Sequence, residues 1–146
     1  MNDLTDLGNK YGTDKAFGHG YTTVYHELFK EMRDEKIKIL ELGVGDLGAS
    51  AKMWREYFPK AEVYIFDPFF IPTQEITEKE LESHNIIPIK GNQLSREDLH
   101  RVGKDGVLFK IIKIKTMKKI VGMETSITAF GDVRVTKSGA FFRQAK

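Results

Sequence analysis

A short apolar strand that runs directly into a pair of glycines is the feature that most constrains the fold. Residues 37–42 are mostly aliphatic and include one acid, and Gly43 and Gly45 follow at once. Glycines at such a turn let the backbone approach a ligand closely and open the following helix. Taken alone, a Gly-x-Gly sequence also fits an ordinary tight turn, so its neighbours must decide between the two interpretations.

Helical and strand patterns alternate on both sides of this turn. Spacing and composition predict helices over residues 21–33, 49–58, 73–84 and 95–102, and strands over 37–42, 61–66 and 86–89. Ser95 and Asp98 resemble a capping box at the last helix. The alternation predicts an α/β fold, a Rossmann-like parallel sheet with flanking helices, over residues 36–105. The glycine-containing segment 3–19 predicts loop or short turns.

The charge distribution marks a boundary near residue 106. Residues 1–106 carry a net charge of −5 and residues 107–146 a net charge of +7, although the whole chain carries +2. We expect one domain over 1–146, with an N-terminal segment and helix (1–35), an α/β core (36–105) and an atypical basic C-terminal segment (106–146). The sheet is expected to be truncated or atypical after its fourth strand. Strands over 125–130 and 133–142 would form a C-terminal hairpin around the Gly131-Asp132 turn.

Composition excludes several classes of protein. The chain has no cysteine, which excludes disulfides, Cys-ligated zinc and thiol nucleophiles. It has no apolar run near the length of a membrane span, and its first ten residues lack a signal-peptide core, so a cytoplasmic protein is expected, without a membrane partner. The basic tail would attract phosphates, but it carries no recognised nucleic-acid-binding motif, and nucleic acid is not an expected partner.

Polar residues lie at or just after the carboxyl end of each of the three predicted strands. Glu41, just before the first glycine, would repel a pyrophosphate but suits a cationic amino group. Asp67 stands 22 residues after Gly45, where a carboxylate can accept hydrogen bonds from both ribose hydroxyls; a solvated acid at the start of a turn is the alternative. The amides of residues 91–93 could read an adenine edge, but this tripeptide alone is more typical of a plain turn.

Residues 39–45 resemble the first glycine motif of class I S-adenosylmethionine-dependent methyltransferases. Residues 10–15, 19–21, 25, 48–50, 53–54 and 57–59 are further similar to the branch of macrolide-sugar O-methyltransferases of the mycinamicin type, to which the cephalosporin hydroxylase-like proteins are related. The resemblance covers residues 1 to about 105. It implies that S-adenosylmethionine is bound by Glu41, Gly43, Gly45, Ser50, Asp67, Gly91, Asn92 and Gln93, and that pocket residues of the N-terminal segment are Tyr11, Thr13, Lys15 and His19.

The C-terminal segment departs from this family. At the fourth strand the family carries carboxylates for a magnesium site and a histidine for acid–base work, whereas Lys113 and Lys115 stand here. No acid lies between Asp105 and Glu124, and no histidine follows His100. A lysine-rich strand end repels a divalent cation, which makes a magnesium site doubtful. The sequence therefore names no catalytic residue.

Three interpretations of function stay open at this point. The resemblance implies a methyltransferase-like protein related to O-methyltransferases of small molecules, with a sugar or polyketide hydroxyl as acceptor. The alternative is an inactive or truncated cofactor-binding remnant that acts as an interaction module; a frameshift or an internal deletion would also explain the tail. A basic nucleic-acid-associating module is the third. An incomplete sheet would leave an uncovered strand edge, which predicts a homodimer.

Overall fold

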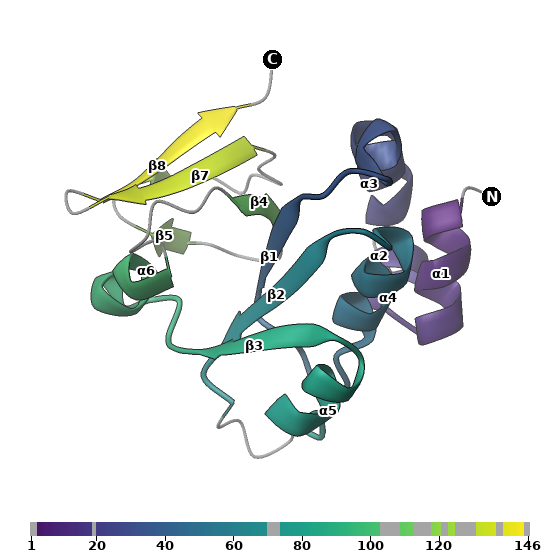
Figure 1. Cartoon of the computed structure of the whole chain (residues 1–146), viewed down its shortest axis with the longest axis horizontal. Coiled ribbons are helices and arrows are strands. Elements are labelled where there is room, and N and C mark those ends of the chain that lie inside the picture. The colour runs from purple at the N-terminus through teal and green to yellow at the C-terminus, as the bar shows by residue number, and fades with distance from the viewer. Residues whose placement is uncertain are drawn as a thin grey trace.

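A six-stranded sheet in the strand order β3-β2-β1-β4-β7-β8 organises the molecule in a computed structural model of the chain (Figure 1). The structure describes residues 3–18, 20–69 and 74–102 with their side chains, and beyond these the backbone of five strands between residues 109 and 144. Strands β1 (Lys38–Leu42), β2 (Glu62–Asp67), β3 (Ile86–Lys90) and β4 (Phe109–Ile112) run parallel. This confirms the predicted parallel α/β sheet.

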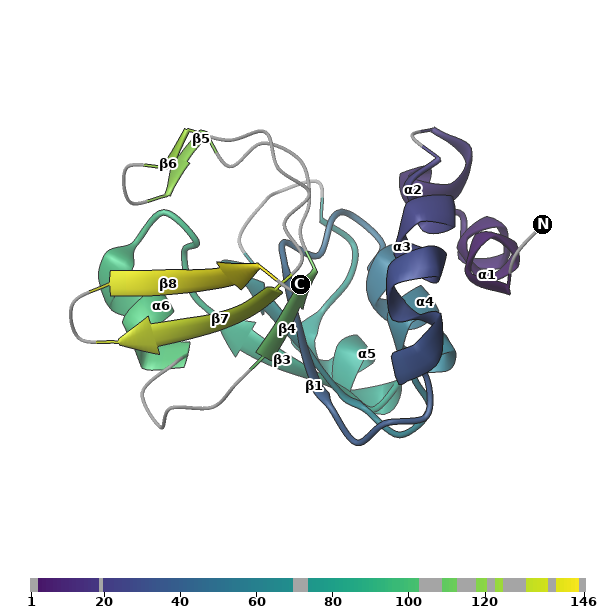
Figure 2. The ribbon, with the colours of Figure 1, turned by 90° about the horizontal axis from the view of Figure 1, so that it is seen from above.

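Helices cover both faces of the parallel strands (Figure 2). They are α1 (Asp3–Tyr11), α2 (Asp14–Phe17), α3 (Tyr21–Phe29), the 3-10 turn η1 (Lys30–Met32), α4 (Ala49–Tyr57), α5 (Glu78–Ser83) and α6 (Arg96–Val102). Alternate residues of a strand point to opposite faces of a sheet. Accordingly, Ile39 packs in the cluster formed with α1, α3 and α4, while Leu40 and Leu42 pack with Phe66 toward α6. Among the described residues, every helix is too short or too polar to cross a bilayer.

The N-terminal segment differs from its prediction of loop or short turns, because its described residues form α1 and α2. Leu4 and Gly8, four residues apart, are both buried on one face of α1. A β-carbon on Gly8 would lie 2.7 Å from the Ala16 side chain and 3.4 Å from the Met53 sulfur. Gly8 is therefore a site of close helix packing and not a turn, a distinction that local sequence does not make.

The C-terminal hairpin is present, but its position was predicted wrongly. Its strands are β7 (Gly131–Thr136) and β8 (Gly139–Gln144), so Gly131 and Asp132 lie in a strand and not in the turn. Strand β7 pairs antiparallel with β4, with Asp132 opposite Lys110, and this pairing sets its register. A small separate ladder joins β5 (Lys118–Ile120) to β6 (Met123–Glu124). Residues 125–130, the other predicted strand, lie outside the described residues.

The helix predicted over 73–84 is shorter than expected. It begins at Glu78, where the Thr77 hydroxyl accepts a hydrogen bond from the Glu80 amide at 3.2 Å. The preceding residues are held by the glycine turn, because the amides of Glu75 and Ile76 both donate to the Asp46 carbonyl at 2.9 Å. Residues 75 and 76 are therefore tied to the glycine turn, and the helix begins only after the Thr77 cap. Strands β3 and β8 form the edges of the sheet, and the homodimer stays a prediction.

Replacing Gly8 with alanine is expected to lower the free energy of unfolding by about 1–3 kcal/mol. Alanine favours a helix by up to about 1 kcal/mol over glycine, but here its methyl group would overlap the Ala16 side chain. The control is Asp6→Ala, which adds the same residue to the exposed face of α1. Urea unfolding followed by circular dichroism measures both variants, and a Gly8→Ala protein as stable as the wild type would show that α1 does not pack this closely.

Candidate functional site

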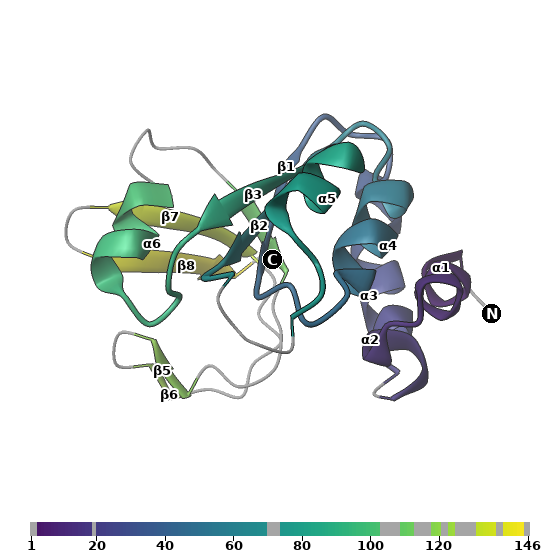
Figure 3. The same ribbon diagram turned by 90° about the horizontal axis from the view of Figure 1, so that it is seen from below.

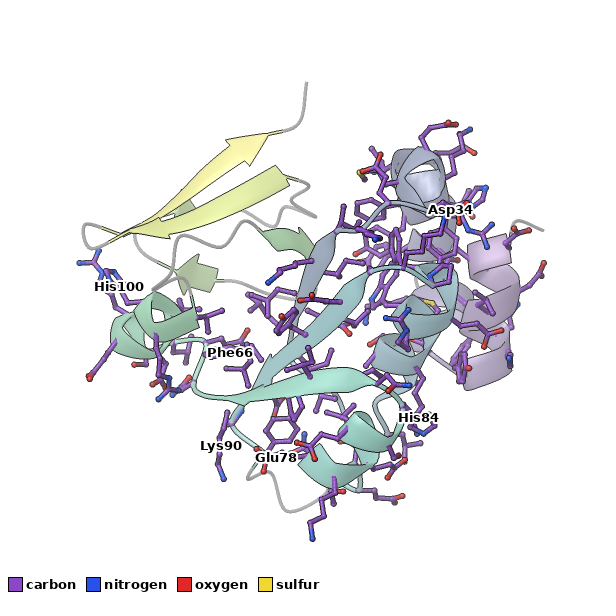
Figure 4. All side chains as sticks on the ribbon, viewed as in Figure 1. Asp34, Phe66, Glu78, His84, Lys90 and His100 are labelled. Atoms are coloured by element: carbon purple, nitrogen blue, oxygen red, sulfur yellow. The ribbon has the colours of Figure 1, made fainter. Side chains whose placement is uncertain are left out.

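Two buried acids lie at the carboxyl ends of adjacent parallel strands. Glu41 is next to last in β1 and is 1% exposed, and Asp67 ends β2 and is 4% exposed. Lys90, the last residue of β3, lies at this same edge of the sheet, while Asp34 lies near the opposite end of β1 (Figure 4). In open α/β sheets, ligands bind at the carboxyl edge. The two acids therefore stand where the topology places a binding site.

The Glu41 carboxylate is satisfied on one oxygen and not on the other. The Ser50 hydroxyl donates to Oε1 at 2.8 Å, and the Lys15 ammonium lies 3.1 Å from the same oxygen. Oε2 is buried and has no hydrogen-bond partner in the part of the chain that the structure describes. A buried acceptor without a donor is costly, so this oxygen is suited to a ligand that brings a donor.

Asp67 holds the glycine turn in place. Its Oδ2 accepts from the Val44 amide at 3.0 Å, and its Oδ1 accepts from the Phe69 amide at 2.8 Å and from the Gln74 side chain at 3.2 Å. A carboxylate offers about four acceptor positions. Asp67 thus keeps about one position for a ligand, and a second would require Gln74 to move.

The turn between β1 and α4 is open on the side of its glycines. Gly43 has a φ of 85° and Gly45 a φ of 65°, which side chains rarely adopt, and a β-carbon on either would meet nothing within 4 Å. The amide of Gly43 donates to the Phe66 carbonyl at 2.9 Å and continues the β1–β2 ladder into the turn. The backbone here is fixed, yet free space remains for a close-fitting ligand.

The three residues of the loop after β3 differ in role: Gly91 and Asn92 serve the structure, and Gln93 is available to a ligand. A β-carbon on Gly91 would lie 2.6 Å from the Phe66 ring, so packing alone requires glycine there. Asn92 forms a local turn, with its side-chain oxygen accepting from the Leu94 amide at 2.9 Å. The Gln93 Oε1 atom is buried without a partner among the described residues. Of the three residues that the resemblance indicates, Gln93 is the one whose side chain is available to a ligand.

The cap of α6 follows its sequence signal in part. The Ser95 hydroxyl accepts from the Asp98 amide at 3.2 Å, as a capping box requires. The Asp98 carboxylate does not return to Ser95 but accepts from the Asn92 amide at 2.7 Å. This helix therefore holds the β3 loop through Asp98.

Of the four residues indicated in the N-terminal segment, the structure describes three, and these do not all lie at Glu41. Lys15 reaches Glu41, and the buried Thr13 accepts a hydrogen bond from the Lys15 amide at 3.4 Å as it caps α2. Tyr11 instead donates to Glu56 at 2.5 Å, and this hydrogen bond raises the pKa of the Tyr11 phenol. Tyr11 lines a separate cleft of about 400 Å³ near the start of α4. His19 lies outside the described residues.

Two further residues bear on the site, although the sequence does not place them among the cofactor or pocket candidates. Gln74 binds Asp67, and its position seven residues later in a polar stretch gives no signal. Tyr25 of α3 is 1% exposed, and burial, followed by the negative charge of Glu41, raises the pKa of its phenol. Tyr25 belongs to the predicted helix over 21–33 and to the segment that resembles the family, but neither observation predicts its closeness to Glu41.

The described residues contain no group of three histidine or acidic side chains that could hold a metal ion. Strand β4 ends at Ile112, and Lys113 and Lys115, which the sequence places after it, lie outside the described residues.

Known proteins resemble this chain in sequence, although no profile of a known protein family matches it. Mycinamicin VI 2''-O-methyltransferase from Micromonospora griseorubida is 29% identical over 117 residues, which are 75% of this chain and 28% of that protein. The 8-demethyl-8-(2-methoxy-alpha-L-rhamnosyl)-tetracenomycin-C 3'-O-methyltransferase of Streptomyces olivaceus is 30% identical with the same coverage. L-olivosyl-oleandolide 3-O-methyltransferase of Streptomyces antibioticus is 41% identical over 73 residues. The matched part thus spans little more than a quarter of the first two relatives.

The fold agrees with these relatives. The MycE methyltransferase of the mycinamycin pathway, solved with Mg and SAH, superposes with a TM-score of 0.58 at 18% identity, over 100% of this chain and 49% of that one. A second MycE structure, which also contains mycinamycin VI, gives a TM-score of 0.53. The sequence and structural matches concur: this chain is a homologue of the mycinamicin-type sugar O-methyltransferases and has their methyltransferase fold.

Proposed function

We propose that the chain binds S-adenosylmethionine at the carboxyl edge of β1 and β2 and serves the transfer of a methyl group to a hydroxyl of a small molecule. The observation that carries the proposal is the Glu41 carboxylate, which is 1% exposed and keeps one oxygen without a partner among the described residues. A buried anionic acceptor beside an open glycine turn suits a cationic ligand group better than a phosphate.

The groups that the structure leaves available match the parts of this cofactor in order along the sheet edge. Glu41 on β1 would accept from the α-ammonium, Asp67 on β2 from a ribose hydroxyl, and Gln93 after β3 from the adenine amino group. When bound, the cofactor supplies an electrophilic methyl group on a sulfonium. The residues of this chain would then bind both ends of the cofactor and so hold the methyl group in one orientation.

The acceptor class is proposed from the relatives. Their names describe methyl transfer to sugar hydroxyls on macrolide and tetracenomycin compounds. We infer that this chain acts on a hydroxyl of the same kind of glycosylated polyketide. Such transfer often needs a general base to take the hydroxyl proton. Among the residues described at the strand ends, every candidate base already belongs to the proposed cofactor site.

One observation favours a second candidate function, a cofactor-binding module without catalysis. Between Asp105 and Glu124 the sequence has lysines and no acid, and no histidine follows His100. The family resemblance would place carboxylates and a histidine directly after β4. A protein of this kind would bind the cofactor and transfer no methyl group, so binding and transfer must be measured separately.

Titration of S-adenosylhomocysteine into the purified protein by calorimetry tests the proposal. We expect micromolar binding, and binding at least about tenfold weaker in Glu41→Gln, because a hydrogen bond to a charged group contributes about 1.5–3 kcal/mol. Asp34→Asn is the matched control, since Asp34 is an exposed acid paired with Lys60 near the opposite end of β1. A folded wild-type protein that does not bind S-adenosylhomocysteine would contradict the proposal.

A further inference from the structure

A nearly buried ion pair joins the N-terminal segment to the glycine motif. Lys15 of α2 and Glu41 of β1 approach to 3.1 Å, with side chains 15% and 2% exposed. Helix α2 packs against α1 and α3 on the same side of the sheet as α4, whose Ser50 also binds Glu41 (Figure 3). Two segments far apart in the sequence thus place opposite charges side by side at the proposed cofactor site.

The pair is asymmetric in its use of donors and acceptors. Both Ser50 and Lys15 contact Oε1 of Glu41, and Oε2 is left without a partner among the described residues. A lysine ammonium has three N–H donors, and a single carboxylate oxygen cannot use them all. The pair therefore offers one free acceptor and free donor capacity next to each other. An α-amino acid group, with an ammonium beside a carboxylate, has the complementary arrangement.

We propose that Lys15 and Glu41 together bind the zwitterionic amino-acid end of the cofactor, with the Lys15 ammonium holding its α-carboxylate and Glu41 Oε2 accepting from its α-ammonium. This inference rests on the proposed function and adds Lys15 as a binding residue. The ion pair is already formed and largely removed from water before the ligand arrives, which reduces the cost of ordering and desolvating these side chains on binding. The short α2 segment thereby becomes part of the cofactor site.

Three ligands distinguish the contribution of Lys15 to binding from that of Glu41. S-adenosylhomocysteine carries both charged groups, 5′-deoxy-5′-(3-aminopropylthio)adenosine keeps the ammonium and lacks the carboxylate, and 5′-methylthioadenosine lacks both. We expect the wild-type protein to bind S-adenosylhomocysteine roughly 10- to 100-fold more tightly than the aminopropyl analogue, because only the former engages Lys15. In Lys15→Met this preference should disappear, while the affinity for methylthioadenosine stays unchanged.

Lys10→Met is the matched control, because Lys10 belongs to the same segment but is exposed and pairs with Glu56 at 2.6 Å. It should keep the full preference for the carboxylate. If Lys15→Met leaves the Glu41 charge too poorly compensated for folding, the double variant Lys15→Met/Glu41→Gln removes both charges, and it too should show no preference.

The outcomes distinguish the two proposals. A Lys15→Met protein that still prefers S-adenosylhomocysteine over the aminopropyl analogue overturns the role of Lys15. Equal weakening of both ammonium ligands also overturns it, because Lys15 would then serve only to support Glu41. Failure of the folded wild-type protein to bind S-adenosylhomocysteine and methylthioadenosine alike would instead reject the cofactor site itself.

Discussion

Replacing Trp54 with alanine is expected to lower the free energy of unfolding by about 3–5 kcal/mol. Trp54 is fully buried in α4, with its ring centroid 5.5 Å from that of Tyr25, 6.2 Å from that of Phe29 and 6.0 Å from that of Phe58. Its indole nitrogen has no hydrogen-bond partner among the described residues. The loss therefore comes from packing and from the cavity left between α3 and α4. Small domains are stable by only about 5–15 kcal/mol, so this is a large fraction of the total.

Circular dichroism in urea is the measurement for this variant, since the substitution removes the chain's single tryptophan and its fluorescence. Leu94→Ala is the control, because Leu94 is 74% exposed and its truncation should change the unfolding free energy by no more than about 0.5 kcal/mol. A Trp54→Ala protein within 1 kcal/mol of the wild type, a margin well below the cavity range, would show that α3 and α4 are not held together through this ring.

The central strands and the glycine turn were predictable because their signals are local. A short, mostly aliphatic run followed directly by glycines predicts β1 and the turn without reference to the rest of the chain. The same holds for β2 and Asp67, because the Asp-Pro sequence at the end of the apolar run predicts where the strand ends. The two buried acids of the candidate site follow from these elements once the strands are placed parallel.

The N-terminal helices were not predictable, because glycine was interpreted as a turn signal. Gly12 does lie in a turn, with a φ of 72°, but Gly8 lies inside α1 and is explained by its neighbours Ala16 and Met53. Those neighbours are contacts across the fold, which residue spacing does not reveal. The contact of Lys15 with Glu41 was missed for the same reason, since 26 residues separate the two.

Gly91, which the family motif suggests as a ligand contact, also has a structural reason to be glycine. In the structure its place is explained by the Phe66 ring, 2.6 Å from where a β-carbon would stand. Phe66 itself packs toward α6 with Leu99 and Val102 (Figure 4). A glycine can thus belong to a binding motif because a neighbouring side chain needs the space, and only coordinates separate this reason from direct contact with a ligand.

The largest effect on cofactor binding is expected from Asp67→Ala, which should weaken S-adenosylhomocysteine binding by about 100-fold or more. Asp67 is proposed to accept from the ribose, and charged hydrogen bonds of this kind contribute about 1.5–3 kcal/mol each. The same carboxylate also accepts from the Val44 and Phe69 amides at 3.0 and 2.8 Å. Its removal therefore releases the glycine turn as well, and the free energy of unfolding should fall by about 1–3 kcal/mol, because Val44 is buried and its amide loses its partner.

Two further variants separate these contributions. Asp67→Asn keeps the shape but replaces one accepting oxygen with a donor, so it cannot satisfy both amides and should weaken binding and stability alike. Gln74→Ala leaves both amide contacts intact and frees the position on Oδ1 that Gln74 occupies at 3.2 Å. If the ribose uses that position, Gln74→Ala should bind S-adenosylhomocysteine as tightly as the wild type or more tightly. Calorimetry and urea unfolding on the same samples give both quantities, and an Asp67→Ala protein that loses stability but keeps its affinity would confine Asp67 to holding the turn.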